Sequence, residues 1–284
     1  HYQAGLFNVY RAVSRLGDLD AVVHLGDYIY EYGRRGHDEA KGVEQGRLFE
    51  PAHATVSLAD YRARHAQYKT DPDLQAAHAT APWICVWDDH ESANNSWLGG
   101  AEGHHPSTEG AWSARKAAAV RAWYEWMPVR DPQPGRAAEA IYRSFQFGAL
   151  LSLIMLQSRL VARAPQPDYE TDRGWTSGPA GPPVPDLQRF AARLNDPARH
   201  MLGPQQEAWL ASYRFFMHPR CMNCHPSGDA PLQGEDSHVH AQHVTRGPDG
   251  KGLFALKCAS CHQDRNLPGP NTPPGHPNWH LPGA

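Results

Sequence analysis

The chain has 284 residues and a formal net charge of −3, from 27 basic and 30 acidic side chains. This length allows one large domain or two smaller ones. The near-balanced charge gives no electrostatic basis for binding nucleic acid or an anionic membrane. No apolar run approaches the ~20 residues of a transmembrane helix, so we expect no spanning segment. Because the chain begins at His1, we expect that a leader has been removed or that the start is missing.

Apolar residues at helical spacing predict a series of helices. They cover residues 5–16, 58–70, 72–80, 111–126, 187–194 and 204–216. Ser57 is positioned to cap the second of these helices, with Asp60 in its first turn. We expect His65 to lie on the polar surface of that helix. The segments 34–57 and 98–109 are expected to be loops, with His104 and His105 exposed to solvent.

Two short apolar runs end in polar, metal-binding residue types. Residues 21–25 lead into Gly26 and Asp27, and residues 83–87 lead into the sequence DDHE at 88–91. Both runs read as buried strands, and open α/β sheets bind ligands just beyond the carboxyl ends of their strands. Oxygen and nitrogen ligands from two neighbouring strands indicate a metallophosphatase type of site. Further on, 141–147 and 149–156 predict a hairpin through Gly148, with the second strand buried.

Five segments of distinctive composition follow one another along the chain. They are GDYIYEYG (26–33), WDDHESANNSW (87–97), ARKAAAVRAWYEWMPVR (114–130), YRSFQFGALLSLIMLQSRL (142–160) and DPARHMLGPQQEAWL (196–210). In this order they resemble the PhoD-type alkaline phosphatase and phosphodiesterase family. The resemblance covers about residues 2–210. It implies a metallophosphatase-like α/β sandwich that acts on small-molecule phosphoesters.

The resemblance also implies roles for individual residues. Asp27 would bridge two metal ions, and Tyr30 would bind iron through its phenolate oxygen. Asp89 takes the place of the asparagine in the wider metallophosphatase motif. Asn94 or Asn95 would lie close by, with Asn94 expected as a further ligand. Carboxylate and phenolate oxygens suit the hard cations Ca²⁺ and Fe³⁺. His90 and Arg159 would act on the phosphate, His90 at the phosphate or the leaving oxygen and Arg159 as a clamp.

Three departures from the family pattern put activity in doubt. The family carries a metal-binding cysteine just upstream of the block that begins at Tyr2, before this chain starts. The carboxylate of the family's carboxylate-Thr-Arg segment is an amide, Gln157, in this chain, which suggests a lost contact. The family's later Gly-Asp-x-His motif is absent after residue 210, where a cysteine-rich tail follows. We therefore expect residues 1–216 to form a truncated PhoD-like domain with about half of a metal site.

The cysteines point to different chemistry in the tail. Cys85 stands alone in a predicted strand and is expected to be a small buried apolar residue. The other four lie in two C-x-x-C-H motifs, formed by Cys221, Cys224 and His225 and by Cys258, Cys261 and His262. This motif attaches c-type haem through two thioethers, with the histidine as an axial ligand. Structural zinc and disulfides are the alternatives.

Residues 217–284 are proline-rich, and they resemble a bacterial di-haem cytochrome c-like family over CMNCHPSGDAPLQG and LKCASCHQDRNLPG. Such a segment buries too little apolar surface to order itself alone, and two covalently held haems would supply a core. His240 and His280 lie at workable distances for second axial ligands. The haem hypothesis implies an electron-transfer role with a redox partner protein. It also implies export to the periplasm or cell surface, because attachment needs an oxidising compartment.

The two parts lead to one structural expectation. Asp27 and Asp89 should converge to a distance at which they can share a cation, because neighbouring strands carry them. The sheet of the first part should have an uncovered edge where the family's later strands would pair. The tail should form an irregular lobe, since proline removes the donors that a long strand needs. The sequence leaves open whether the two parts form a true fusion or a joined or truncated reading frame.

Overall fold

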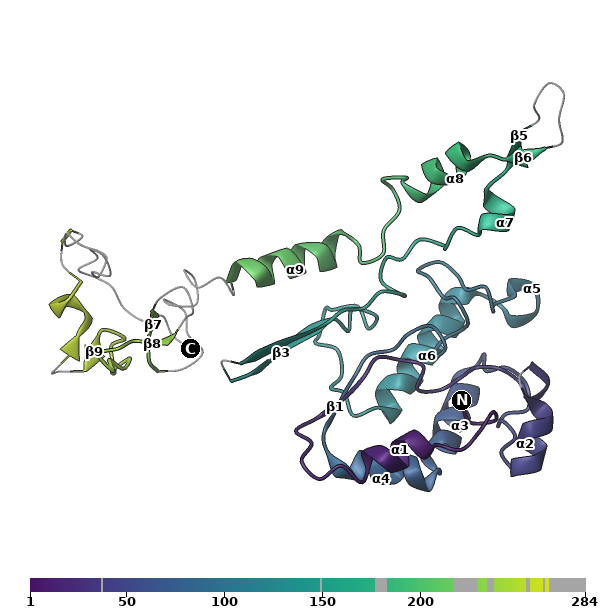
Figure 1. Cartoon of the computed structure of the whole chain (residues 1–284), viewed down its shortest axis with the longest axis horizontal. Coiled ribbons are helices and arrows are strands. Elements are labelled where there is room, and N and C mark those ends of the chain that lie inside the picture. Colours follow the sequence, from purple (N-terminus) through teal and green to yellow (C-terminus); the bar gives the residue numbers. More distant parts are fainter. Residues whose placement is uncertain are drawn as a thin grey trace. The chain divides into compact units, whose positions relative to one another are not determined.

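The computed structural model describes residues 1–36, 38–148, 150–176, 183–216, 229–233, 238–253, 256–262 and 264–265. The chain divides into two compact units, His1–Pro204 and Gln205–Ala284. Figure 1 shows the elements of both units in chain order. Among the described residues, no helix combines the length and the apolar character needed to cross a bilayer.

The helices of the first unit are α1 (Asn8–Val13), α2 (Glu39–Gln45), α3 (Leu58–Lys69), α4 (Pro72–Thr80), α5 (Pro106–Glu109), α6 (Trp112–Trp126), α7 (Tyr169–Asp172) and α8 (Leu187–Leu194), with a 3₁₀ turn at Arg34–Gly36. Most match the predicted segments. The helix predicted over 5–16 is shorter, because α1 has no side-chain cap and buries no residue. The segments 34–57 and 98–109 were predicted to be loops but contain the short helices α2 and α5.

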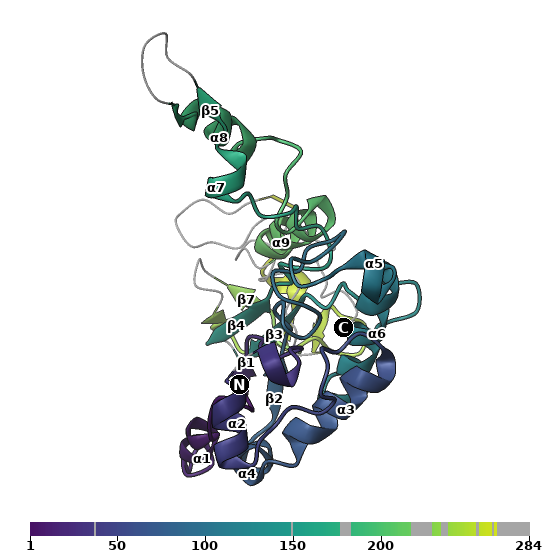
Figure 2. The same cartoon turned by 90° about the vertical axis from the view of Figure 1, so that its right-hand side faces the viewer.

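The start of α3 confirms the predicted cap. The Ser57 hydroxyl accepts a hydrogen bond from the Asp60 amide at 3.2 Å, and Asp60 accepts one from the Ser57 amide at 2.8 Å. This reciprocal pair satisfies two amides that would otherwise lack partners at the first turn. Helices α3 and α6 pack side by side (Figures 1 and 2), and their facing sides contribute Tyr61 and Trp123 to the core.

The strands form small sheets. The described strands of the first unit are β1 (Val22–His24), β2 (Trp83–Cys85), β3 (Arg143–Phe147), β4 (Leu151–Met155), β5 (Trp175–Thr176) and β6 (Val184–Pro185). Strands β1 and β2 pair in parallel, while β3–β4 and β5–β6 are antiparallel. Every sheet in the described part of the chain has two strands. The protein is therefore a mixed α/β protein, and the fuller sandwich stays a prediction.

The β3–β4 hairpin forms as predicted, but its second strand is not buried as a whole. The register pairs Arg143 with Met155 and Phe147 with Leu151. Met155 is buried at one end, whereas Leu151 at the other end is 54% exposed. An isolated two-stranded ribbon has no neighbouring strand or helix to cover its outer end. The predicted burial of 149–156 is therefore wrong for the part nearest the turn.

The second unit contains α9 (Pro204–Phe216) and, in its described part, the strands β7 (Leu232–Gln233), β8 (His238–Val239), β9 (Gly252–Leu253) and β10 (Leu256–Lys257). Strands β7–β8 and β9–β10 form two antiparallel pairs, and a 3₁₀ turn follows at Cys258–Ser260. The boundary at residue 217 and the two domain assignments stay predictions.

His65 lies inside the protein, so the predicted surface position is wrong. Its ring stacks between those of Tyr28 and Trp126, with centroid distances of 6.3 and 6.5 Å. Neither ring nitrogen has a hydrogen-bond partner among the described residues. Burial, aided by the charges of Lys69 and Arg64, lowers the pKa of His65 to about 3.

This burial predicts a stability that depends on pH. The folded-state pKa lies below the ordinary value of 6.5, so the unfolded chain binds more protons between these values. Stability from the neutral ring is fully present above pH 6.5 and is lost as the pH falls toward 3. Between pH 7.5 and pH 5.5, the free energy of unfolding measured with denaturant should fall by about 1 kcal/mol more in wild-type than in His65→Phe. His105→Gln, at an exposed site, should keep the wild-type pH dependence; equal losses in His65→Phe would contradict the prediction.

Candidate active site

The loop that follows β1 has a backbone that few residue types tolerate. Gly26 has φ +110°, and a Cβ at this position would lie 2.2 Å from the amide nitrogen of Asp88. Only glycine lets the loops after β1 and β2 approach so closely. Asp27 follows with φ +56°, a conformation that Asp and Asn adopt more readily than other non-glycine residues.

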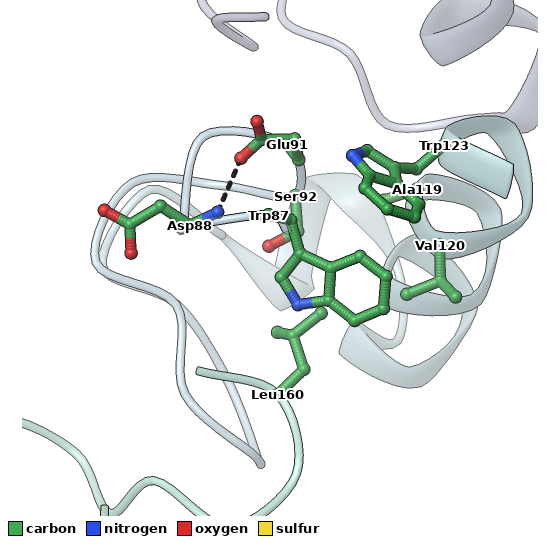
Figure 3. Close-up of a pocket in the computed structure, with 8 residues that line it drawn as sticks. All are labelled: Trp87, Asp88, Glu91, Ser92, Ala119, Val120, Trp123 and Leu160. Carbon is green, nitrogen blue, oxygen red and sulfur yellow. Dashed lines mark hydrogen bonds between the residues drawn. The ribbon is translucent and has the colours of Figure 1, made fainter. Parts of the chain in front are cut away.

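Glu91 holds the ends of the two strands together. Its Oε1 accepts a hydrogen bond from the Tyr28 amide at 2.6 Å, and its Oε2 accepts one from the Asp88 amide at 2.9 Å. Figure 3 shows the second of these bonds beside the indole of Trp87. That indole meets Trp123 of α6 edge-on, with ring centroids 4.9 Å apart. One buried carboxylate therefore joins both loops at the base of the site.

Three candidate ligands converge where the strands end. One ligand atom from each of Asp27, Asp89 and His90 lies within 4.8 Å of the other two. The expected approach of Asp27 and Asp89 is therefore present in the structure. The Asp27 Oδ1 atom is buried and has no hydrogen-bond partner among the described residues. A buried carboxylate oxygen without a donor is costly, and a cation would satisfy it.

Two tyrosine rings pack around the candidate ligands Asp27 and His90. The Tyr30 hydroxyl donates a hydrogen bond to Asp27 Oδ2 at 3.2 Å. The Tyr30 ring stacks on the His90 imidazole with centroids 4.3 Å apart, and the Tyr32 ring meets the same imidazole edge-on at 5.3 Å. The Tyr30 oxygen thus lies beside Asp27, and its role as an iron ligand stays a prediction.

Arg159 contacts both aspartates that follow β2. Its Nε lies 2.5 Å from Asp88 Oδ1, and its Nη2 lies 3.4 Å from Asp89 Oδ1. The preceding Gln157 is buried, and its side-chain oxygen accepts a hydrogen bond from the Val161 amide at 3.1 Å. Gln157 therefore shapes the turn that carries Arg159, so its amide retains a contact in this chain.

The charges around Asp27, Asp89 and His90 favour the binding of a cation. Burial raises the pKa of Asp27, and the carboxylates of Asp89 and Asp88 raise it further, against the opposing effect of His90. Burial favours the neutral form of His90, but hydrogen bonding to Glu31 and the nearby carboxylates outweigh it and raise its pKa. Anionic groups that destabilise one another in this way are typical of sites that bind a cation.

The loop after the DDHE sequence contributes main-chain groups. The Asn95 amide donates a hydrogen bond to Asp89 Oδ2 at 2.6 Å, and Asn95 has φ +52°. The Asn94 amide donates to Glu31 Oε1. The predicted role of the Asn94 side chain as a metal ligand stays a prediction. His104, expected in solvent, is instead buried, with Nδ1 3.1 Å from Glu109, while His105 is exposed as expected.

The haem-motif residues are described only in part. The first motif, with Cys221, Cys224 and His225, lies outside the described residues. In the second motif, the amides of Cys261 and His262 both donate to the Cys258 carbonyl, at 3.2 and 2.9 Å. Cys258 is a buried free thiol and Cys261 an exposed one.

Three residues that support the candidate site, Glu31, Arg64 and Glu91, were given no role in the sequence analysis. Glu31 and Glu91 each lie next to a predicted site residue, and for Glu31 a carboxylate within an aromatic segment was a usable signal. Arg64 gave no such signal, because it lies on α3 and reaches the site only through main-chain carbonyls.

Comparisons with known proteins agree with the geometry of the first unit. A family model described as PhoD-like phosphatase matches residues 1–214. The chain belongs to the PhoD-like phosphatase family. It is 38% identical over 210 residues to alkaline phosphatase D of Bacillus subtilis (strain 168), covering 74% of this chain and 32% of that protein.

A solved structure of PhoD is also similar, with a TM-score of 0.57 and 34% identity. The match covers 74% of this chain and 36% of the PhoD chain. The chain thus spans about a third of the length of these two relatives. The family match ends at residue 214, so the resemblance of 217–284 to cytochrome c-like proteins stays a prediction.

Proposed function

We propose that the site of Asp27, Asp89 and His90 is the centre of a metal-dependent phosphoester hydrolase. The observation that carries the proposal is the approach of their three ligand atoms to within 4.8 Å, at the ends of paired parallel strands. Membership of the PhoD-like phosphatase family supports the same reaction class. The substrate class is a small-molecule phosphomonoester or phosphodiester.

The residues present suit hard metal ions. Asp27 and Asp89 supply carboxylate oxygens, Tyr30 a phenol oxygen, and the buried Asp27 Oδ1 lacks a donor among the described residues. Burial and the neighbouring Asp27 carboxylate raise the pKa of Tyr30, so its oxygen ionises only beside a cation. We propose Ca²⁺ and Fe³⁺, with Asn94 as a further ligand. Bound metal ions polarise the phosphoryl group and make a nucleophile available at moderate pH.

The protein's own side chains bind and orient the substrate. Arg159 engages Asp88 and Asp89 through Nε and Nη2, which leaves hydrogens of the same guanidinium to bind a phosphate oxygen. His90 uses Nδ1 for its bond to Glu31, so Nε2 is available to contact the phosphate or the leaving oxygen. The buried Glu91 keeps the two ligand-bearing loops in register.

The test is hydrolysis of p-nitrophenyl phosphate and its bis ester at alkaline pH, with Ca²⁺ and iron supplied. We expect hydrolysis of these esters, and we expect it to require the metal ions. Arg159→Met should lower kcat/KM by about 100-fold, because it removes a charge-assisted contact to the phosphate. Arg121→Met, which removes an exposed partner of Glu125 on α6, should retain wild-type rates. A folded, metal-supplied chain that cleaves neither ester would refute the hydrolase proposal.

A second function is favoured by the turn at Cys258–Ser260. We propose that the tail carries c-type haem on both C-x-x-C-H motifs and transfers electrons to a redox partner protein, in a periplasmic or secreted location. Cys258 and Cys261 are three residues apart, and the Cys261 amide donates to the Cys258 carbonyl in a single helical turn, which suits the spacing of two thioether bonds to one haem. Burial lowers the pKa of His240, and the charge of His262 contributes to this shift. We propose His240 as a second axial ligand.

Expression with haem-attachment machinery, followed by a pyridine haemochrome spectrum, tests the haem proposal. We expect two haems per chain and one in Cys258→Ser/Cys261→Ser, whose first motif is intact. Stoichiometric zinc without a Soret band would favour the structural zinc alternative and contradict the haem proposal.

A further inference from the structure

Glu31 is buried directly behind the candidate active site. Its side chain is 2% exposed, and its Oε2 lies 2.8 Å from His90 Nδ1. Its other oxygen, Oε1, accepts a hydrogen bond from the Asn94 amide at 2.5 Å. Both carboxylate oxygens are thus bound, one to the imidazole and one to the loop that follows it.

The main chain around Glu31 is fixed on both sides. The Arg64 guanidinium donates hydrogen bonds to the carbonyl oxygens of Tyr30 and Tyr32, the residues immediately before and after Glu31. The Glu31 carbonyl accepts a hydrogen bond from the Thr55 amide at 2.8 Å. Arg64 is fully buried, so these contacts anchor the main chain from which the Glu31 side chain extends to His90.

The chemistry of this contact decides which imidazole nitrogen carries the hydrogen. An ionised carboxylate only accepts hydrogen bonds, so His90 must donate through Nδ1. In the neutral ring, Nε2 is then the basic nitrogen. The rings of Tyr30 and Tyr32 hold the imidazole plane from stacked and edge-on positions. Orientation and tautomer are therefore both fixed by the segment 30–32.

We propose that Glu31 is a positioning residue that holds His90 in the Nδ1–H tautomer with Nε2 available to the reacting phosphoester. The catalytic consequence depends on the hydrolase function proposed above, whereas the tautomer itself does not. Glu31 touches neither substrate nor metal in this scheme, and its effect on the reaction passes through His90.

Glu31→Gln is a sharp probe, because glutamine has nearly the same size. The structure presents two donors to the side chain, His90 Nδ1–H and the Asn94 amide, whereas glutamine offers a single acceptor oxygen and a donor NH₂. If the glutamine oxygen stays on the Asn94 amide, its NH₂ group faces His90 Nδ1, which can accept only in the Nε2–H tautomer. If the oxygen stays on Nδ1–H, the contact with the Asn94 amide is lost. Loss of such a supporting partner typically lowers activity 10–100-fold, so we expect kcat to fall by about that factor. Glu44→Gln, at an exposed position of α2, should keep wild-type kcat.

Two measurements separate positioning from a general effect on folding. The full chain is labelled with ¹⁵N-histidine, loaded with Ca²⁺ and studied by NMR. The ring signals of His90 are those that disappear in His90→Gln. Their ¹⁵N chemical shifts should show that Nδ1 carries the hydrogen. The double variant Glu31→Gln/His90→Gln should be no slower than His90→Gln alone, because the effect of Glu31 passes through the imidazole.

The proposal is overturned if wild-type His90 is the Nε2–H tautomer, or if Glu31→Gln slows the reaction equally in the His90→Gln background. The wild-type tautomer measurement decides the matter even where Glu31→Gln fails to fold. If wild-type turns over no phosphoester but shows Nδ1–H, the hydrolase proposal fails while the positioning by Glu31 stands.

Discussion

Replacing Arg64 by methionine is expected to lower the free energy of unfolding by at least about 3 kcal/mol. The guanidinium is fully buried, and it donates to four carbonyl oxygens, those of Tyr30, Tyr32, Glu50 and Pro51. Methionine fills similar space but offers no donor. Each buried carbonyl left without a partner costs about 1–3 kcal/mol, and relaxation recovers only part of the total.

Guanidinium chloride unfolding followed by tryptophan fluorescence measures this loss. The matched control is Arg62→Met on the same helix, since the Arg62 side chain is 42% exposed and its ion pair with Glu125 lies at the surface. Surface ion pairs contribute little, so this variant should remain close to wild-type. If Arg64→Met were no less stable than Arg62→Met, the account of Arg64 as the anchor of segment 30–32 would be wrong.

Asp27→Asn is expected to weaken metal binding by more than about 100-fold. The substitution keeps size and the left-handed backbone conformation, which asparagine also tolerates, but removes one of the anionic ligands. Without metal, the same variant should be as stable as wild-type or more stable. The reason is that burial and the neighbouring carboxylates of Asp88 and Asp89 disfavour the Asp27 charge.

Calorimetric titration with Ca²⁺ and thermal unfolding of the metal-free protein give the two readouts. Asp18→Asn, at an exposed position before β1, should match wild-type in both. The opposite pattern in Asp27→Asn, with unchanged affinity and a large loss of stability, would identify Asp27 as a structural residue.

The arrangement of the two ligand-bearing loops was predictable because it follows from local signals. Gly26-Asp27 and the DDHE sequence each come directly after a short apolar run, and both runs form strands. Parallel pairing of β1 with β2 brings the ends of the strands together, so the approach of Asp27 to Asp89 needed no knowledge of distant contacts. The capping of α3 by Ser57 was predictable for the same reason.

Features that depend on distant packing were not predictable. His65 has polar neighbours in sequence, yet it is buried because Tyr28 and Trp126 come from other parts of the chain. Leu151 lies in an apolar run but stays exposed, since no described element covers that end of the hairpin. Glu31 and Arg64 serve the site through contacts 59 and 34 residues away in the chain, which no local pattern reveals.

The most direct test of the metal site is X-ray diffraction from crystals of the full chain grown with Ca²⁺ and Fe³⁺, with anomalous data collected at the iron edge. The account predicts an iron peak within about 2.0–2.6 Å of carboxylate oxygens of Asp27 and of the Tyr30 oxygen, with Asp89 on the same metal or on a neighbouring Ca²⁺. An empty space between Asp27 and Asp89 in metal-saturated crystals, or metal bound only elsewhere, would contradict it.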